Sequence, residues 1–140
     1  MGKINPSRVI LGGIVGGIVI NILEYLIHEV VLKSQHVDTM KALGKTMPEG
    51  GSTIVVWMVY GFLWAIASVW LYAAIRPRFG PGAKTAICAG ITAWFFSCLL
   101  PGIAMWNMTV MPFSPLEHVL ELVAMVCAVL AGAAIYKEAA

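Results

Sequence analysis

Four apolar stretches, each long enough to cross a bilayer as a helix, constrain this chain more than any other feature of its sequence. Charged residues make up only 11% of the chain, too few to cover a water-facing surface. The sequence therefore predicts an all-α, polytopic membrane protein that folds as a single domain over residues 1–140. Its transmembrane helices are expected at residues 9–32, 54–75, 83–100 and 116–136, joined by short loops into a four-helix bundle.

The connectors carry most of the charge, and this charge predicts the orientation. Between the first two spans, a short interfacial helix is expected at residues 39–43, with Asp38 as its cap and Gly44 at its end. Six of the nine Lys and Arg residues fall on the side of both termini, and three fall on the other side. Because positively charged loops stay inside, both termini are predicted to be cytoplasmic, in a bacterial inner membrane. No basic run suits nucleic-acid binding, so the expected partners are the lipid bilayer, other membrane subunits or further copies of the chain.

Polar residues inside the predicted spans supply the candidate site. Glu24 and His28 lie near the end of the first span, and His118 and Glu121 lie near the start of the fourth. A rise of about 1.5 Å per residue places all four in one outer layer of the membrane. Asn21 precedes Glu24 by three residues and shares its helical stripe. Since charged groups in hydrocarbon avoid lipid, we expect a polar pocket between the first and last helices.

Several chemistries are open to these polar residues. They could simply bond one another and hold the helices together. His28 and His118 could ligate a haem or a chlorophyll-type pigment. With Glu24 and Glu121 they could hold a transition metal such as zinc or iron. Glu24 could also carry protons in a small proton-linked transporter.

Two further patterns concern methionine and the small residues. Met105, Met108 and Met111 recur every third residue after the third span. Their thioethers suit Cu(I), and adaptable packing at the membrane interface explains them as well. Stripes of small residues on the first and fourth spans predict close helix packing. These residues are Gly12, Gly13, Gly16, Gly17, Ala124, Ala128 and Gly132.

Two segments carry a resemblance to a known group of proteins. Residues 8–32, with their glycine pairs followed by Asn21-Ile22-Leu23-Glu24, resemble small four-helix bacterial membrane proteins that have no assigned function. Residues 70–82, from Trp70-Leu71-Tyr72 to Gly80-Pro81-Gly82, resemble the same group. The resemblance covers nearly the whole chain. It implies a four-helix bundle and transfers no catalytic residue.

The small size of the chain and its close-packing stripes favour one hypothesis for function. This hypothesis is a non-catalytic accessory or structural subunit of a homo-oligomer or a larger membrane complex. One alternative is a haem-, pigment- or metal-binding membrane protein that uses His28 and His118 with Glu24 and Glu121. Another is a proton-linked small-molecule transporter centred on Glu24.

Overall fold

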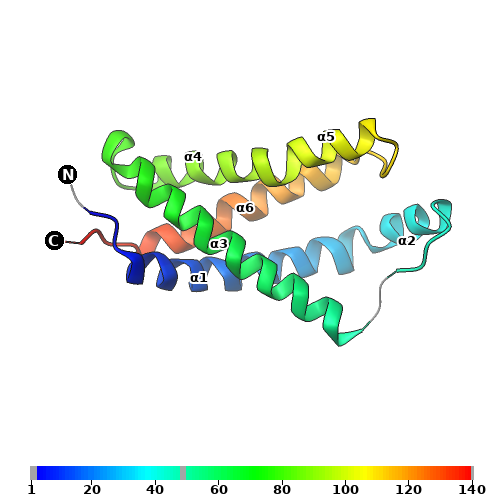
Figure 1. Cartoon of the computed structure of the whole chain (residues 1–140), viewed down its shortest axis with the longest axis horizontal. Coiled ribbons are helices and arrows are strands. Elements are labelled where there is room, and N and C mark those ends of the chain that lie inside the picture. The colour runs from blue at the N-terminus through cyan, green and yellow to red at the C-terminus, as the bar shows by residue number, and fades with distance from the viewer. Residues whose placement is uncertain (1–2, 48–49, 140) are drawn as a thin grey trace.

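The computed structural model describes residues 3–47 and 50–139 and shows a bundle of helices (Figure 1). Among these residues, four helices are long and apolar enough to cross a membrane. The predicted all-α class with four spans is thereby confirmed. In chain order, the elements are α1 (Pro6–Tyr25), the π-helical segment η1 (Leu26–Val31), α2 (Lys33–Ala42), α3 (Gly51–Phe79), α4 (Ala83–Trp94), the π-helical segment η2 (Phe95–Leu99), α5 (Leu100–Asn107) and α6 (Pro115–Ile135).

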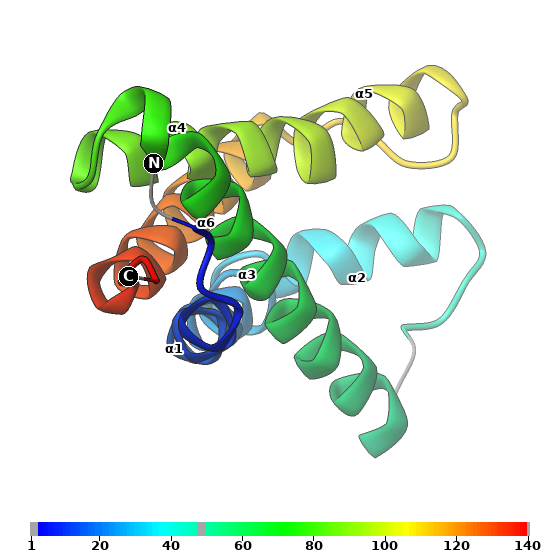
Figure 2. The same cartoon turned by 60° about the vertical axis from the view of Figure 1, so that its left-hand side comes forward.

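The bundle has one closed end and one end from which helices project. α1 lies against both α3 and α6, and α6 also packs against α4. The two termini lie together, and α2 and α5 extend past the bundle at the opposite end (Figure 1; Figure 2). α3 crosses α1 obliquely in both views. We call these two ends of the molecule the terminal end and the α2 end.

Three of the predicted boundaries differ most from the structure. The third span does not stop at residue 100 but continues through α5 to Asn107. It tolerates Pro101 because this residue lies in the first turn of α5, where proline's missing N–H is least costly. The second span runs through Pro77 to Phe79, and Gly80 follows with a φ of +82°. The interfacial helix is longer than residues 39–43, because it begins at Lys33.

Of the two ends predicted for this interfacial helix, the N-terminal cap is wrong and the C-terminal glycine is confirmed. Asp38 does not cap α2, because it lies inside the helix and the N-cap position makes no side-chain hydrogen bond. Gly44 does follow the end of the helix, with a φ of +66°. This backbone conformation favours glycine, which explains why the helix stops there.

The first of two glycine faces on α1 meets α6. A Cβ atom on Gly12 would lie 2.7 Å from the carbonyl oxygen of Gly132, and one on Gly16 would lie 2.8 Å from that of Ala128. The two backbones therefore touch, as small residues allow in membrane helices. All seven small residues that the stripes singled out are buried in the structure, namely Gly12, Gly13, Gly16, Gly17, Ala124, Ala128 and Gly132.

The second glycine face of α1 meets α3. A Cβ atom on Gly13 would collide with Ile66, and one on Gly17 would collide with the ring of Phe62. Adjacent glycines are about 100° apart around a helix, so each pair can serve two neighbours at once. The glycine pairs of α1 thus place this helix against α3 and α6, and α6 carries half of the candidate site.

Two tyrosines hold the terminal end together. The hydroxyl oxygen of Tyr136 accepts a hydrogen bond from the backbone N–H of Asn5 at 3.2 Å. The hydroxyl oxygen of Tyr72 accepts one from the backbone N–H of Gly82 at 3.3 Å. The two rings meet edge to face with centroids 5.8 Å apart. These contacts join both termini to the α3–α4 connector.

Candidate metal site at the α2 end

α6 directs two carboxylates toward the end of the first span. The helix begins after Ser114, whose hydroxyl oxygen accepts a hydrogen bond from the backbone N–H of Glu117. Glu117 and Glu121 are four residues apart, so they lie on one face of α6 about one turn from each other. Glu24 lies at the end of α1 and His28 lies in η1, which contacts α6. Four groups from two helices therefore converge.

His28 lies between two carboxylates. Its Nε2 atom is 2.9 Å from Oε1 of Glu121 and 3.0 Å from Oε2 of Glu24. Glu121 is buried, with 6% of its surface exposed, and the other two side chains are half-buried. One Nε2–H group cannot donate two linear hydrogen bonds, so the two carboxylates compete for one proton. The other oxygen of Glu24 is buried and has no hydrogen-bond partner among the described residues. These three side chains therefore present more hydrogen-bond acceptor atoms than the nearby hydrogen-bond donors can satisfy.

A second group of ligands lies beside the first, toward α2. The ring of His36 stacks on that of His28, with centroids 5.0 Å apart and ring planes 23° apart. Nε2 of His36 is 3.6 Å from Oε1 of Glu117. The ligand atoms of Glu24, His28 and Glu121 all lie within 4.8 Å of one another, and so do those of His28, His36 and Glu117. Metal–ligand bonds of about 2.1 Å bring donor atoms to within about 4 Å, so small side-chain adjustments would let either trio hold an ion.

Negative charge exceeds positive charge in this Glu–His cluster, which we define as Glu24, His28, His36, Glu117 and Glu121. Its three carboxylates outnumber its two imidazoles, so one negative charge remains even if both rings are protonated. The nearby Lys33 pairs instead with Glu29 at 3.2 Å, where both side chains are exposed. Uncompensated charge away from water is costly. The cluster therefore favours uptake of additional protons or of a cation.

The π-helical segment η1 explains why two histidines eight residues apart lie ring to ring. Eight residues of α-helix turn the chain through two full turns and about 80° more. A π-turn holds one residue more than an α-turn, which sets the rotation back by roughly 100°. His36 thereby returns to the face of His28, although the helix bends at Leu32. Single π-turns are frequently found at functional sites.

His118 does not join the Glu–His cluster. Its Nδ1 atom is 2.8 Å from the carbonyl oxygen of Ser114, and its ring lies 4.4 Å from that of Phe113 between centroids. Its Nε2 atom is buried without a hydrogen-bond partner among the described residues and faces Gly102 of α5. Since His118 follows Glu117 directly, it points about 100° away around α6. The pairing of His28 with His118 is therefore replaced in the structure by the pairing of His28 with His36.

Asn21 also lies apart from the Glu–His cluster. Its side-chain amide donates to the carbonyl oxygens of Gly17 at 2.7 Å and Met58 at 3.3 Å. Gly61 of α3 lies against the same amide. Asn21 thus joins α1 to α3 where the two helices cross, as polar residues do between membrane helices.

The three methionines are distributed along the end of the third span and the loop that follows. Met105 lies in α5, Met108 directly follows it, and Met111 lies in the loop before α6. Met105 and Met108 are exposed, with 48% and 70% of their surfaces accessible. Exposure of this kind fits the adaptable surface role of methionine.

Comparison with known proteins gave no relative from which a function could be carried over. No family model, no curated protein and no solved structure matches the chain. This result agrees with the resemblance to four-helix membrane proteins that have no assigned function. The chemistry of the Glu–His cluster is therefore the basis on which a function can be proposed.

Proposed function

We propose that the protein binds a divalent transition-metal ion within the membrane, at Glu24, His28 and Glu121. The observation that carries this proposal is the approach of two carboxylate oxygens to one imidazole nitrogen, at 2.9 and 3.0 Å. Imidazole and carboxylate together suit zinc, ferrous iron or manganese. Ionisable groups inside a membrane bundle are costly and usually serve function. His36 and Glu117 lie outside this trio and form a second, neighbouring trio with His28.

The protons of the ion-free cluster are part of this proposal. A ligating imidazole presents a free nitrogen lone pair, and ligating carboxylates are deprotonated. The proton that His28 shares with Glu24 and Glu121 would therefore be displaced by the ion. Metal binding is expected to release protons, and to weaken as the pH falls.

Replacement of Glu121 by glutamine is the direct test of the proposed site. The full chain, purified in mild detergent and stripped by a chelator, is titrated with Zn²⁺ by calorimetry, and bound metal is counted by elemental analysis. We expect stoichiometric binding by the unaltered chain. Glu121→Gln is expected to weaken it by more than about 100-fold, because loss of a direct ligand exceeds the 10- to 100-fold effect of an outer-shell partner.

The matched control for this experiment is Glu29→Gln. Glu29 lies one residue after His28 and forms an exposed ion pair with Lys33. The same change of charge and shape there should leave Zn²⁺ affinity within about threefold, a difference of less than 1 kcal/mol. The proposal fails if the unaltered chain binds no more metal than a detergent blank. It also fails if Glu121→Gln and Glu29→Gln bind equally well.

We further propose that the chain lies in a bacterial inner membrane, with both termini in the cytoplasm. The excess of Lys and Arg on the terminal side supports this orientation. The isolated bridge between Lys3 and Ala139 supports a shared side for both termini. In this orientation the α2 end, with the Glu–His cluster, faces the outside. Cysteine labelling from either side of intact cells tests the assignment.

A second candidate function is that of a subunit in a homo-oligomer or a larger membrane complex. The first ten residues of α3, positions 51–60, favour it, since all but Thr53 are exposed, Trp57 and Tyr60 among them. In a membrane such a helix end faces either lipid or another helix, so it leaves room for a partner helix to pack. Crosslinking in native membranes tests this candidate. A chain that stays monomeric there and leaves every membrane complex unchanged when deleted would contradict it.

A further inference from the structure

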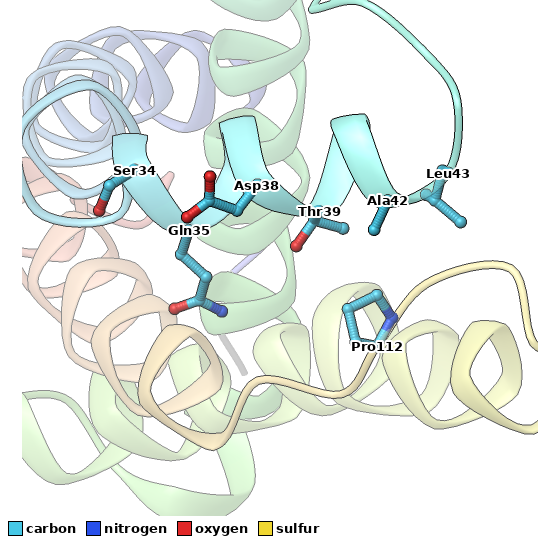
Figure 3. Close-up of a pocket in the computed structure, with 7 residues that line it drawn as sticks. All are labelled: Ser34, Gln35, Asp38, Thr39, Ala42, Leu43 and Pro112. Atoms are coloured by element: carbon cyan, nitrogen blue, oxygen red, sulfur yellow. The ribbon is translucent and has the colours of Figure 1, made fainter.

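A groove runs along the polar helix α2, the helix that contributes His36 to the Glu–His cluster. It measures about 670 Å³ and lies between α2 and the loop that leads into α6. In Figure 3 the side chains of Gln35 and Thr39 extend from α2 toward the loop, and Pro112 lies on the loop side of the groove. Asp38 adds a carboxylate to its lining. Because α2 is polar and projects past the apolar spans, the side of the cluster toward α2 is the side nearer to water.

His36 is the one residue of the Glu–His cluster that α2 contributes. It follows the groove residue Gln35 in sequence, and its ring stacks on that of His28 at 5.0 Å. Its Nε2 atom is 3.6 Å from Glu117, one turn of α6 before Glu121. The imidazole of His28 belongs to both ligand trios. The order from the polar helix α2 to the membrane interior is therefore His36 with Glu117, then His28, and finally Glu121 with Glu24.

We infer that His36 and Glu117 form an outer ligand pair, which takes a divalent metal ion from the water at the α2 end and passes it through His28 to Glu24 and Glu121. This inference rests on the proposed metal binding and adds the route by which the ion arrives. The outer pair is half-buried, whereas Glu121 is buried. An ion that sheds its water in two stages avoids losing every water ligand before protein ligands replace them. The three carboxylates neutralise one divalent ion with one negative charge left over, so one ion is expected to move between the two trios.

The outer pair has a kinetic signature that a resting ligand lacks. A transient station lowers the barrier for arrival and for departure alike, so its loss slows both and leaves the equilibrium nearly unchanged. His36→Ala is therefore expected to slow association and dissociation by about tenfold or more, the effect of about 1.4 kcal/mol in the barrier. The dissociation constant should change by less than about threefold. Glu117→Gln, which keeps the shape of its side chain, should show the same pattern.

The experiment uses Co²⁺ as the probe, since its visible absorption reports the ligands around it. The full chain in nanodiscs is mixed with Co²⁺ in a stopped-flow instrument, and the bound ion is then withdrawn by excess chelator. His118→Ala is the control, because His118 lies off the route and bonds to Ser114. It should keep both rates.

Each outcome separates this inference from the proposed function. Slowed rates with unchanged affinity in both variants would support the outer pair. Unchanged rates would overturn it and leave metal binding intact. Loss of affinity as large as that of Glu121→Gln would also overturn it, because His36 would then be a ligand of the resting ion. Absence of Co²⁺ and Zn²⁺ binding by the unaltered chain would remove the proposed function itself.

Discussion

Replacement of Gly132 by leucine is expected to destabilise the bundle by at least about 3 kcal/mol, the upper part of the range for overpacking. A Cβ atom at this position would lie 2.6 Å from the carbonyl oxygen of Gly12 and 2.5 Å from Cγ2 of Val69. The nearest obstacle on α1 is backbone, so no rotamer change can relieve it. Helix propensity works the other way, since leucine is a better helix former than glycine by somewhat less than about 1 kcal/mol. The steric cost is larger, so the substitution should separate α6 from α1.

Gly51→Leu is the matched control for this substitution. A Cβ atom there meets none of the described residues within 4 Å, and Gly51 begins α3 at an exposed position. Steric trapping or unfolding by increasing fractions of denaturing detergent measures both variants in the same background. The expected order of stability is the unaltered chain and Gly51→Leu together, with Gly132→Leu well below. Equal stability of the two variants would contradict the backbone contact between α1 and α6.

The same contact shows which parts of the fold follow from sequence. The four spans were predictable because a long apolar run has few alternatives to a membrane helix, and the structure changes mainly their ends. The glycine pairs were readable as packing positions because only glycine lets two backbones touch. Gly12 faces α6 and Gly13 faces α3, and which helix each glycine contacts depends on where α6 and α3 lie. Sequence spacing along α1 does not contain this information.

The sequence predicted the depth of the candidate site in the membrane, but it did not predict the direction in which each side chain points. Glu24, His28 and Glu121 come together in the structure, since they share a layer and face each other across α1 and α6. His118 occupies the same layer but points toward α5. One residue of offset turns a side chain by about 100°, which decides membership in a site.

His36 was missed because a uniform α-helix places it about 80° from His28. The π-turn of η1 removes this angle between the two side chains. No motif in the residues of η1 indicates that the turn contains an extra residue. A useful signal was the polarity of residues 33–42, which places a histidine just beyond the apolar run.

For the third span, Pro101 suggested an end to the helix, whereas the chain uses proline in the first turn of a continuing one.

Removal of His28 alone should destabilise the fold more than removal of the whole inner trio. In His28→Leu, Glu24 and Glu121 keep their places and lose the nitrogen that both contact. Breaking a buried ionic group by removing one partner costs about 3–5 kcal/mol, because a buried charge remains uncompensated. The triple variant Glu24→Met, His28→Leu, Glu121→Met leaves no such charge. Apolar replacement of a complete buried group is often neutral or stabilising by about 1–4 kcal/mol.

The comparison of these two variants separates stability from function. Unfolding in detergent is expected to place His28→Leu lowest, with the triple variant at or above the unaltered chain, while both lose Zn²⁺ binding. Recovery of stability without recovery of binding would mean that the trio is kept for the ion it holds, because methionine and leucine pack the helices as well. A triple variant clearly less stable than the unaltered chain would instead show that the hydrogen bonds of the trio hold α1 to α6. The stability of the two variants therefore decides whether the trio is a structural contact, and their Zn²⁺ binding decides whether it is a ligand set.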